Sequence, residues 1–274
     1  MMRRSALRLP ANALLAAWTV IIAIPVYIMI VSCFKTTQEI YRNPLALPES
    51  WDFGNFTEAW VRANFDVYTF NSVVVAVGAV LLTIVLAALA SFPLSRLSVW
   101  WVTPVLGFFL IGLMIPVRLG SVEMFVLMKE LGLLDSHLGL ILVYTAIRLP
   151  FAILIMSSFM RAVPKEFEDA ARIDGAGDLR LLLSVLVPQI KPAVGIVAIF
   201  TTIAVWNDFF FPLMFIFDPD LRTLPLGLAS FTGEYSTNWG LLFAGLTIST
   251  LPLTLAYVVL SRQVREGVGA GGIK

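Results

Sequence analysis

Charged side chains are scarce in this sequence. Of its 274 residues, 14% are Asp, Glu, Lys or Arg, whereas an ordinary soluble domain has about 25%. Hydrophobic residues make up 59% of the chain, and the mean hydropathy is +0.89. This composition excludes a soluble globular enzyme.

Several kinds of reactive group are also missing. The only cysteine, Cys33, cannot form an internal disulfide, and the only histidine, His137, cannot build a histidine-rich metal site. No Gly-Lys dipeptide occurs, so the chain has no phosphate-binding P-loop. The net charge is +1 without a basic block, which argues against a nucleic-acid partner. We therefore predict no catalytic residue, no metal site and no cofactor in this chain.

Long runs with no charge, or with a single charged residue, cover more than half of the sequence. A helix needs about 20 mostly apolar residues to cross a bilayer. The runs therefore predict an all-α polytopic membrane protein, with residues 1–274 as a single transmembrane domain. Six spans are expected, at about 12–34, 66–92, 100–128, 138–160, 192–217 and 243–261. The third is ambiguous, because Pro116 and Gly120 invite a break.

The distribution of Lys and Arg predicts the orientation. With the N-terminus inside and six crossings, 12 of these 19 residues fall on the cytoplasmic side and 6 outside, while Arg148 lies within a span. This bias follows the positive-inside rule and places both termini in the cytoplasm. Arg3 and Arg4 also resemble the start of a signal peptide, but the apolar run after them exceeds the usual length of about 7 to 15 residues. We expect a retained first span.

The most informative segment is the polar loop 161–191, between the fourth and fifth spans. Pro164 suits the first turn of a helix. Glu168 and Asp169 follow in that turn, where the helix dipole favours negative charge. Gly175 is expected to end the helix in the left-handed conformation.

A second helix is expected in the same loop, with Asp178 as its N-cap and Pro188 at its end. Ala170 and Ala171 on the first helix let another surface approach closely. The pattern predicts a helix–turn–helix on the cytoplasmic side. It suits either a docking knob for a partner or an amphipathic linker lying on the membrane.

The loop resembles the EAA loop of binding-protein-dependent ABC transporter permeases. The family pattern is Glu-Ala-Ala, three residues, Gly, nine residues and Ile-x-Leu-Pro. Here it reads Asp169-Ala170-Ala171, Gly175 and Val185-Leu186-Val187-Pro188, with both spacings kept. In the family this loop is a coupling helix that sits in a groove of the ATP-binding subunit. The resemblance implies ATPase-coupling roles for Glu168, Asp169, Ala170, Ala171, Asp174, Gly175 and Pro188.

Other segments are similar to the carbohydrate-uptake branch, with a MalG/MetI-like fold and a MalG-like role. These are Asp174-Gly175-Ala176, Trp206-Asn207-Asp208 and Leu224-Pro225-Leu226-Gly227-Leu228. The resemblance implies a multi-pass subunit of the bacterial inner membrane without an ATPase of its own. Its partners would be a MalF-like second permease, two ATP-binding subunits that bind ATP and Mg, and an extracytoplasmic substrate-binding protein. The binding protein would dock on the outer loops 35–66 and 218–242.

Polar and aromatic residues within or at the ends of the spans are candidates for the substrate path. They are Asn71, Arg148, Asn207, Asp208 and Phe210. Arg148 suits a polar or anionic substrate, the paired subunit or a structural ion pair, because a buried charge in a membrane is costly. Asp208 could instead orient the fifth span, Asn71 could cap the second, and Phe210 could pack between helices or against lipid.

The sequence is also compatible with other functions. An importer of a phosphodiester, polyamine or amino acid is the main alternative, and the Trp206-Asn207-Asp208 segment argues against it. A secondary transporter would need acidic residues deep in several spans, and only Asp208 qualifies. An intramembrane enzyme would need more than one histidine or paired carboxylates.

Overall fold

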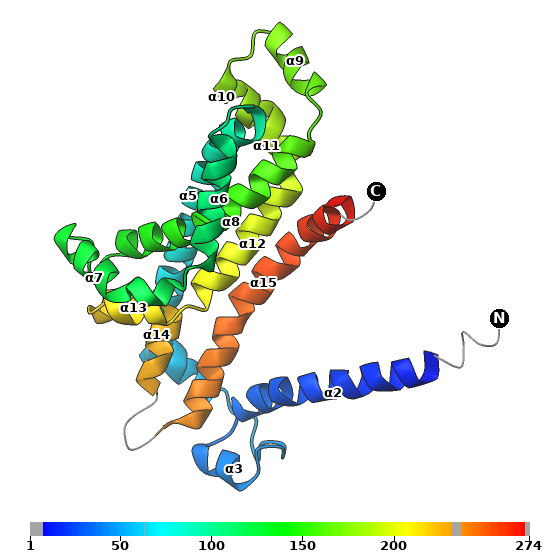
Figure 1. Cartoon of the computed structure of the whole chain (residues 1–274). Coiled ribbons are helices and arrows are strands. Elements are labelled where there is room, and N and C mark those ends of the chain that lie inside the picture. Colours follow the sequence, from blue (N-terminus) through cyan, green and yellow to red (C-terminus); the bar gives the residue numbers. More distant parts are fainter. Residues whose placement is uncertain (1–7, 63, 232–236, 272–274) are drawn as a thin grey trace. The chain divides into compact units, whose positions relative to one another are not determined.

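The computed structural model describes residues 8–62, 64–231 and 237–271, and its elements there are helices (Figure 1). Arg3, Arg4 and residues 272–274 lie outside the described ranges. The long helices are α2 (Arg8–Ser32), α5 (Phe65–Arg96), α8 (His137–Ala162), α12 (Lys191–Trp206) and α15 (Trp239–Gly271). The shorter ones that matter below are α3 (Thr37–Arg42), α4 (Gly54–Thr57), η1 (Glu58–Arg62), α6 (Val102–Met114), η2 (Val117–Gly120), α7 (Ser121–Glu130), α13 (Phe210–Phe215), η4 (Pro219–Leu221), α14 (Leu224–Leu228) and η5 (Ala229–Phe231).

The chain divides into two compact units. The smaller comprises residues 1–66 and 227–251, and the larger comprises residues 67–226 and 252–274. The loop that resembles a coupling helix and all five candidates for the substrate path lie in the larger unit.

Several described helices have the length and composition of membrane spans. Residues 12–32 of α2, the whole of α5 and the whole of α8 each meet that requirement. Two bent pairs, α6 with η2–α7 and the 178–189 segment with α12, are apolar enough as pairs but turn by 84° and 80°. The apolar part of α15 runs from Trp239 to Leu255. An all-α polytopic membrane protein is thus confirmed.

Two predicted spans are not continuous helices. The third, 100–128, breaks after Met114, because Ile115 and Pro116 adopt extended backbone before η2. The fifth, 192–217, ends at Trp206, and a separate short helix, α13, begins at Phe210. In the third span the break falls at the proline that made it ambiguous, whereas nothing in the apolar pattern indicated the second break.

The larger unit has an apolar core between α5, α6, α8 and α12, which lie side by side in Figure 1. Ile153, Met156 and Met160 of α8 are fully buried in it. Ser91 of α5 donates its hydroxyl to the carbonyl oxygen of Ile153 at 3.2 Å. At Gly78 of α5 a Cβ would lie 2.6 Å from Cδ1 of Ile141, so this glycine lets α5 and α8 approach closely.

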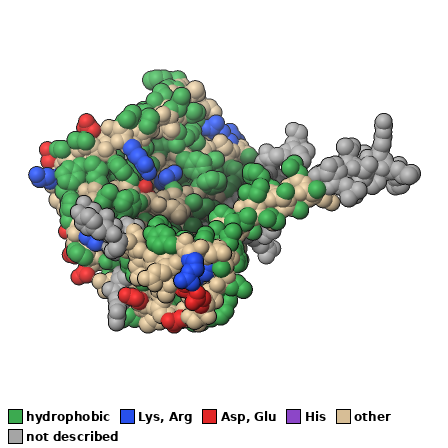
Figure 2. All heavy atoms as spheres, turned by 90° about the horizontal axis from the view of Figure 1, so that it is seen from below, with side chains coloured by type: hydrophobic (Ala, Val, Ile, Leu, Met, Phe, Trp, Pro, Cys, Tyr) green, Lys and Arg blue, Asp and Glu red, His purple; other side chains and the backbone are tan. Residues whose placement is uncertain are grey.

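The surface carries many hydrophobic side chains. Figure 2 shows them over much of the face in view. On α2, Leu14 is 72% exposed and Trp18 is 62% exposed, and Phe108 of α6 is 71% exposed. Exposed apolar faces of this extent need lipid or a partner protein to cover them.

Candidate functional site

The loop 161–191 begins with α9 (Glu166–Ile173) and turns sharply at Gly175. Gly175 has a φ of +79°, the left-handed conformation expected from the sequence. The N–H of Gly175 donates to the carbonyl of Arg172, and the N–H of Ala176 donates to that of Ala171. This pair of bonds is a Schellman motif, which satisfies the last carbonyls of α9 and fixes the direction of the chain.

The second helix of the loop begins at Asp178, as expected, and ends at Gln189, one residue after Pro188. Its segments are α10 (Asp178–Leu181), a π turn η3 (Leu182–Leu186) and α11 (Val187–Gln189). Gly177, not Asp178, is the N-cap, because the Asp178 carboxylate instead accepts from the Arg172 guanidinium at 2.7 Å. Pro188 lies inside this continuous helical segment, just after the π turn, and the segment ends at Gln189.

Apolar side chains stand out from the tip of this loop. Phe167 is 49% exposed, Ile173 86% and Leu179 62%, and we call these three residues the coupling knob. Asp169, Ala170, Asp174, Gly175 and Pro188 are also exposed, and Ala171 is partly so. Leu182 and Leu186, in contrast, are buried in the core of the larger unit. The loop is therefore anchored on one side and presents an uncovered apolar tip on the other.

Glu168 does not lie on the exposed surface where we expected it. It is the buried residue of α9 and forms an ion pair with Arg96, the last residue of α5. The two side chains are 11% and 10% exposed, respectively. Arg96 also donates to the carbonyl of Val163 at 3.3 Å. Arg96 thus ties the first turn of α9 and the end of α8 to the end of α5.

Asn71, a substrate-path candidate, holds a loop at the other end of α5. Its Nδ2 donates to the carbonyl oxygens of Asp220 and Arg222 at 2.8 and 3.0 Å. The hydroxyl of Ser72 accepts from the N–H of Leu224 at 2.8 Å. Asn71 is only 4% exposed, and it lies in the second turn of α5, so it neither caps the helix nor has a free amide to offer a solute.

Asp208 joins two helices of the larger unit. Its Oδ2 accepts from the Tyr144 hydroxyl at 2.9 Å and from the N–H of Phe211, in the first turn of α13, at 3.0 Å. The guanidinium of Arg118 lies 4.0 Å from Oδ1 and 5.0 Å from the ring centroid of Phe210. Asp208 and Phe210 are therefore packed with neighbours rather than free.

The other two substrate-path candidates, Asn207 and Arg148, differ in their hydrogen-bond partners. The Asn207 amide is exposed and donates to the carbonyl of Ile203 at the end of α12. Arg148 is half-buried on α8, and its Nε has no hydrogen-bond partner in the described part of the chain. Arg148 is thus the candidate with unused donor capacity.

The contacts of Asp208 lead to a stability prediction. Asp208→Ala is expected to cost about 1–3 kcal/mol, because it leaves the buried Tyr144 hydroxyl and the Phe211 N–H without an acceptor. Asp208→Asn keeps an acceptor oxygen at the same place and should lose much less. The measurement is the thermal unfolding midpoint in detergent. Equal losses in the two variants would show that the charge of Asp208 matters and the hydrogen bonds do not.

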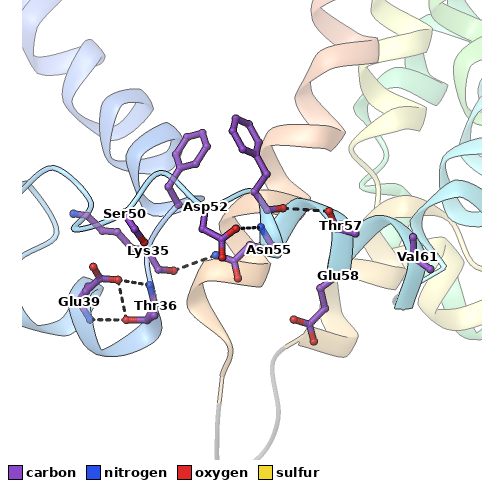
Figure 3. Close-up of a pocket in the computed structure, with 12 residues that line it drawn as sticks. Lys35, Thr36, Glu39, Ser50, Asp52, Asn55, Thr57, Glu58 and Val61 are labelled. Carbon is purple, nitrogen blue, oxygen red and sulfur yellow. Dashed lines mark hydrogen bonds between the residues drawn. The ribbon is translucent and has the colours of Figure 1, made fainter.

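In the smaller unit, residues 34–61 surround an open cavity of about 660 Å³ (Figure 3). Asn55 donates from Nδ2 to the carbonyl of Lys35 at 3.1 Å, and Asp52 accepts from the N–H of Gly54 at 3.0 Å. The Lys35 side chain is buried, and its Nζ donates to the carbonyls of Asn43 and Pro44. Burial lowers the pKa of the Lys35 ammonium below its ordinary value, although the charge of Glu39 opposes that effect.

Glu39 gives this loop a pH dependence. It completes a capping box with Thr36 at the start of α3, and the N–H and hydroxyl of Thr36 hold the pKa of Glu39 below its ordinary value of 4.5. A carboxylate with a lowered pKa stabilises the fold above its ordinary pKa, and that contribution is lost as the pH falls through the lowered value. The protection factors of the amides in residues 36–42, which correct for the intrinsic pH dependence of exchange, should therefore fall below pH 4.5 in the wild type. In Glu39→Ala, which removes the capping acceptor, the protection factors should be low already at pH 7, and wild-type protection there would contradict this role.

Comparison with known proteins now identifies the kind of protein. The family described as "Binding-protein-dependent transport system inner membrane component" matches residues 4–268. The chain belongs to this family. The assignment from the EAA-like loop is thereby confirmed.

Individual relatives of this inner membrane component agree over nearly its whole length. The diacetylchitobiose uptake system permease protein NgcG of Streptomyces coelicolor is 36% identical over 263 residues, which cover 95% of this chain and 87% of NgcG. The sulfoquinovosyl glycerol transport system permease protein SmoH of Agrobacterium fabrum is 31% identical, covering 91% and 88%. A chain of a bacterial ABC transporter involved in import of the acidic polysaccharide alginate has the same fold, with a TM-score of 0.80 and 20% identity over 92% of this chain and 94% of that one.

Sequence reasoning missed two residues that organise this inner membrane component. In the sequence analysis Arg96 was only one of the charges assigned to the cytoplasmic side. A lone basic residue directly after a 29-residue uncharged run marks the end of a helix, and its guanidinium needs an anionic partner. Tyr144 carried no signal, because its partner Asp208 lies 64 residues further along the chain.

Proposed function

We propose that the chain is the membrane-spanning permease subunit of an ATP-driven importer for a sugar, an oligosaccharide or a sugar derivative. An extracytoplasmic binding protein would deliver the solute. Two relatives, NgcG and SmoH, are named for the uptake of diacetylchitobiose and sulfoquinovosyl glycerol, and these names support this substrate class. The chain itself would hydrolyse nothing.

The observation that carries the proposal is the coupling knob. An exposed apolar tip on a polar loop is costly in water and is expected to be covered by a protein. The Schellman motif at Gly175 fixes its shape, and Leu182 and Leu186 anchor its base in the core. A tip that is rigid, anchored at its base and uncovered is suited to receive the motion of a partner subunit. Two ATP-binding subunits, which hold ATP and Mg, would supply that motion, one of them through this loop.

The contacts of the larger unit agree with the proposed orientation. Arg96, Val163 and Glu168 meet at one end of α5, on the side proposed as cytoplasmic. At the other end, Asn71 contacts the 220–222 segment, and the His137 ring lies 3.1 Å from the carbonyl of Leu221. These segments all fall on the outer side when both termini are cytoplasmic.

The exposed apolar face of α2 fits a bilayer and a second, MalF-like permease. Arg148 would face the solute or that partner, because an arginine within a span needs a polar neighbour. The packed environments of Asp208 and Phe210 favour a supporting role for both. A substrate with an anionic group would suit the unused donor of Arg148.

The experiment is mass spectrometry of the proteins that co-purify with the tagged chain in mild detergent. We expect an ATP-binding subunit and a second permease. A chain that purifies alone, under conditions that preserve known importers, would overturn the proposal.

A further inference from the structure

Helix α5 is held by polar contacts at both ends. At one end Asn71 and Ser72, 4% and 3% exposed, bond to the backbone of residues 220–224. At the other end Arg96 pairs with Glu168 in the first turn of α9. The outer contacts are three hydrogen bonds to main-chain atoms, and the inner contact is an ion pair with little access to water. Neither is the kind of exposed surface pair that forms and breaks freely.

A single helix, α5, connects the two sets of contacts, and Pro93 lies in its last turn before Arg96. Arg96 follows Asn71 by 25 residues, about 37 Å at 1.5 Å per residue. Between them, Ala87, Ala88 and Leu94 lie in the core, and Ser91 bonds to the carbonyl of Ile153 on α8. Because packed cores resist continuous deformation, α5 should move as one body when either end moves.

We propose that α5 is the rod that links the coupling loop to the outer loop 218–224, with Arg96–Glu168 and Asn71–Ser72 as its two clamps. This rests on the proposed function, in which ATP-binding subunits press on the knob and a loaded binding protein docks outside. Displacement of α9 is passed through Glu168 to Arg96, along α5, and through Asn71 and Ser72 to residues 220–224. The four side chains are positioning residues: they touch no substrate, and they decide whether the two sides of the membrane act together.

The clamps differ from ordinary structural contacts in what their loss should change. The two clamps act in series along α5, so cutting either one should remove the same communication. A contact that only stabilised the fold would instead lower assembly or basal activity. The ratio of stimulated to basal ATPase activity separates the two roles.

The test uses the whole importer complex in lipid nanodiscs, with the loaded binding protein added. Glu168→Gln keeps the shape of the side chain and removes its charge. Ser72→Ala removes the acceptor for Leu224 at the far end and leaves the coupling loop untouched. In each variant we expect the stimulation by binding protein to fall about 10-fold, with basal ATPase activity and subunit composition retained.

Two further variants sharpen the result. Ser95→Ala is the matched control, because Ser95 neighbours Arg96 but contacts neither α9 nor residues 220–224. Its hydroxyl bonds to the carbonyl of Phe92 on its own helix and lies 3.8 Å from the sulfur of Met160 on α8, and the variant should keep full stimulation. The double variant Glu168→Gln with Ser72→Ala should lose no more than either single variant, because both cut one link.

Unchanged stimulation in either single variant would overturn the proposal that α5 acts as a rod. Losses that multiply in the double variant would overturn it as well. If Glu168→Gln does not assemble, the result for Ser72→Ala decides. If the wild type carries no ATP-binding subunit, the proposed function fails, and that outcome is distinct from failure of the rod.

Discussion

Ile173→Asp is expected to release the ATP-binding subunit from the permease while leaving the permease folded. Ile173 is 86% exposed at the tip of the loop, so its replacement removes no packing within the chain. In the complex it would be buried in a groove, where an unpaired carboxylate is costly. Loss of a central apolar anchor costs about 2 kcal/mol or more, which is roughly 30-fold in affinity. The measurement is the Kd of purified ATP-binding subunit for the permease in nanodiscs.

A matched control separates this contact from a general effect of added charge. Leu47→Asp makes the same kind of change at a residue that is 63% exposed in the 35–66 loop, proposed to lie on the other side of the membrane. It should leave the Kd for the ATP-binding subunit unchanged. Wild-type affinity in Ile173→Asp would show that the coupling knob is not the contact.

Gly175→Val is expected to weaken binding of the ATP-binding subunit about 10-fold by distorting the loop. A residue with a Cβ pays roughly 1–2 kcal/mol in the left-handed conformation, and a β-branched residue pays more. A Cβ at this glycine would meet no atom within 4 Å, so the cost comes from the backbone alone. The chain should relieve this backbone strain by breaking the hydrogen bonds of the Schellman motif, and Ile173 would move as a result. Binding and hydrogen exchange of residues 166–178 report the two effects.

Gly177 supplies the control two residues away. It is extended, with φ −74° and ψ 169°, and a Cβ there also meets nothing within 4 Å. Valine adopts that backbone readily, so Gly177→Val should bind the ATP-binding subunit as the wild type does. Equal weakening by both variants would point to bulk at the interface and away from the conformation of Gly175.

Local sequence signals predicted the elements of this chain well where the cause was local. Uncharged runs located the long helices, and Gly175 ended α9 where a residue with positive φ was needed. The helix break at Ile115 and Pro116 was visible because proline cannot donate a hydrogen bond. These features depend on a few neighbouring residues.

Features that depend on distant partners were not predictable in this way. Glu168 looked like a surface carboxylate in a polar loop, and only the fold brings Arg96 to it across 72 residues of sequence. Asn71 looked like a cap or a pore residue, although its acceptors lie about 150 positions further along. A single sequence shows which residues can form such bonds, and the packing of the helices determines which bonds form.

The most direct test of the proposed function is solute uptake into liposomes. The vesicles would hold this permease, its partner permease and the ATP-binding subunits, with the loaded binding protein on the opposite side from ATP. We expect sugar uptake that requires ATP and binding protein together and that Ile173→Asp abolishes. Uptake by this chain alone, without ATP or any partner, would contradict it and show a self-sufficient secondary transporter.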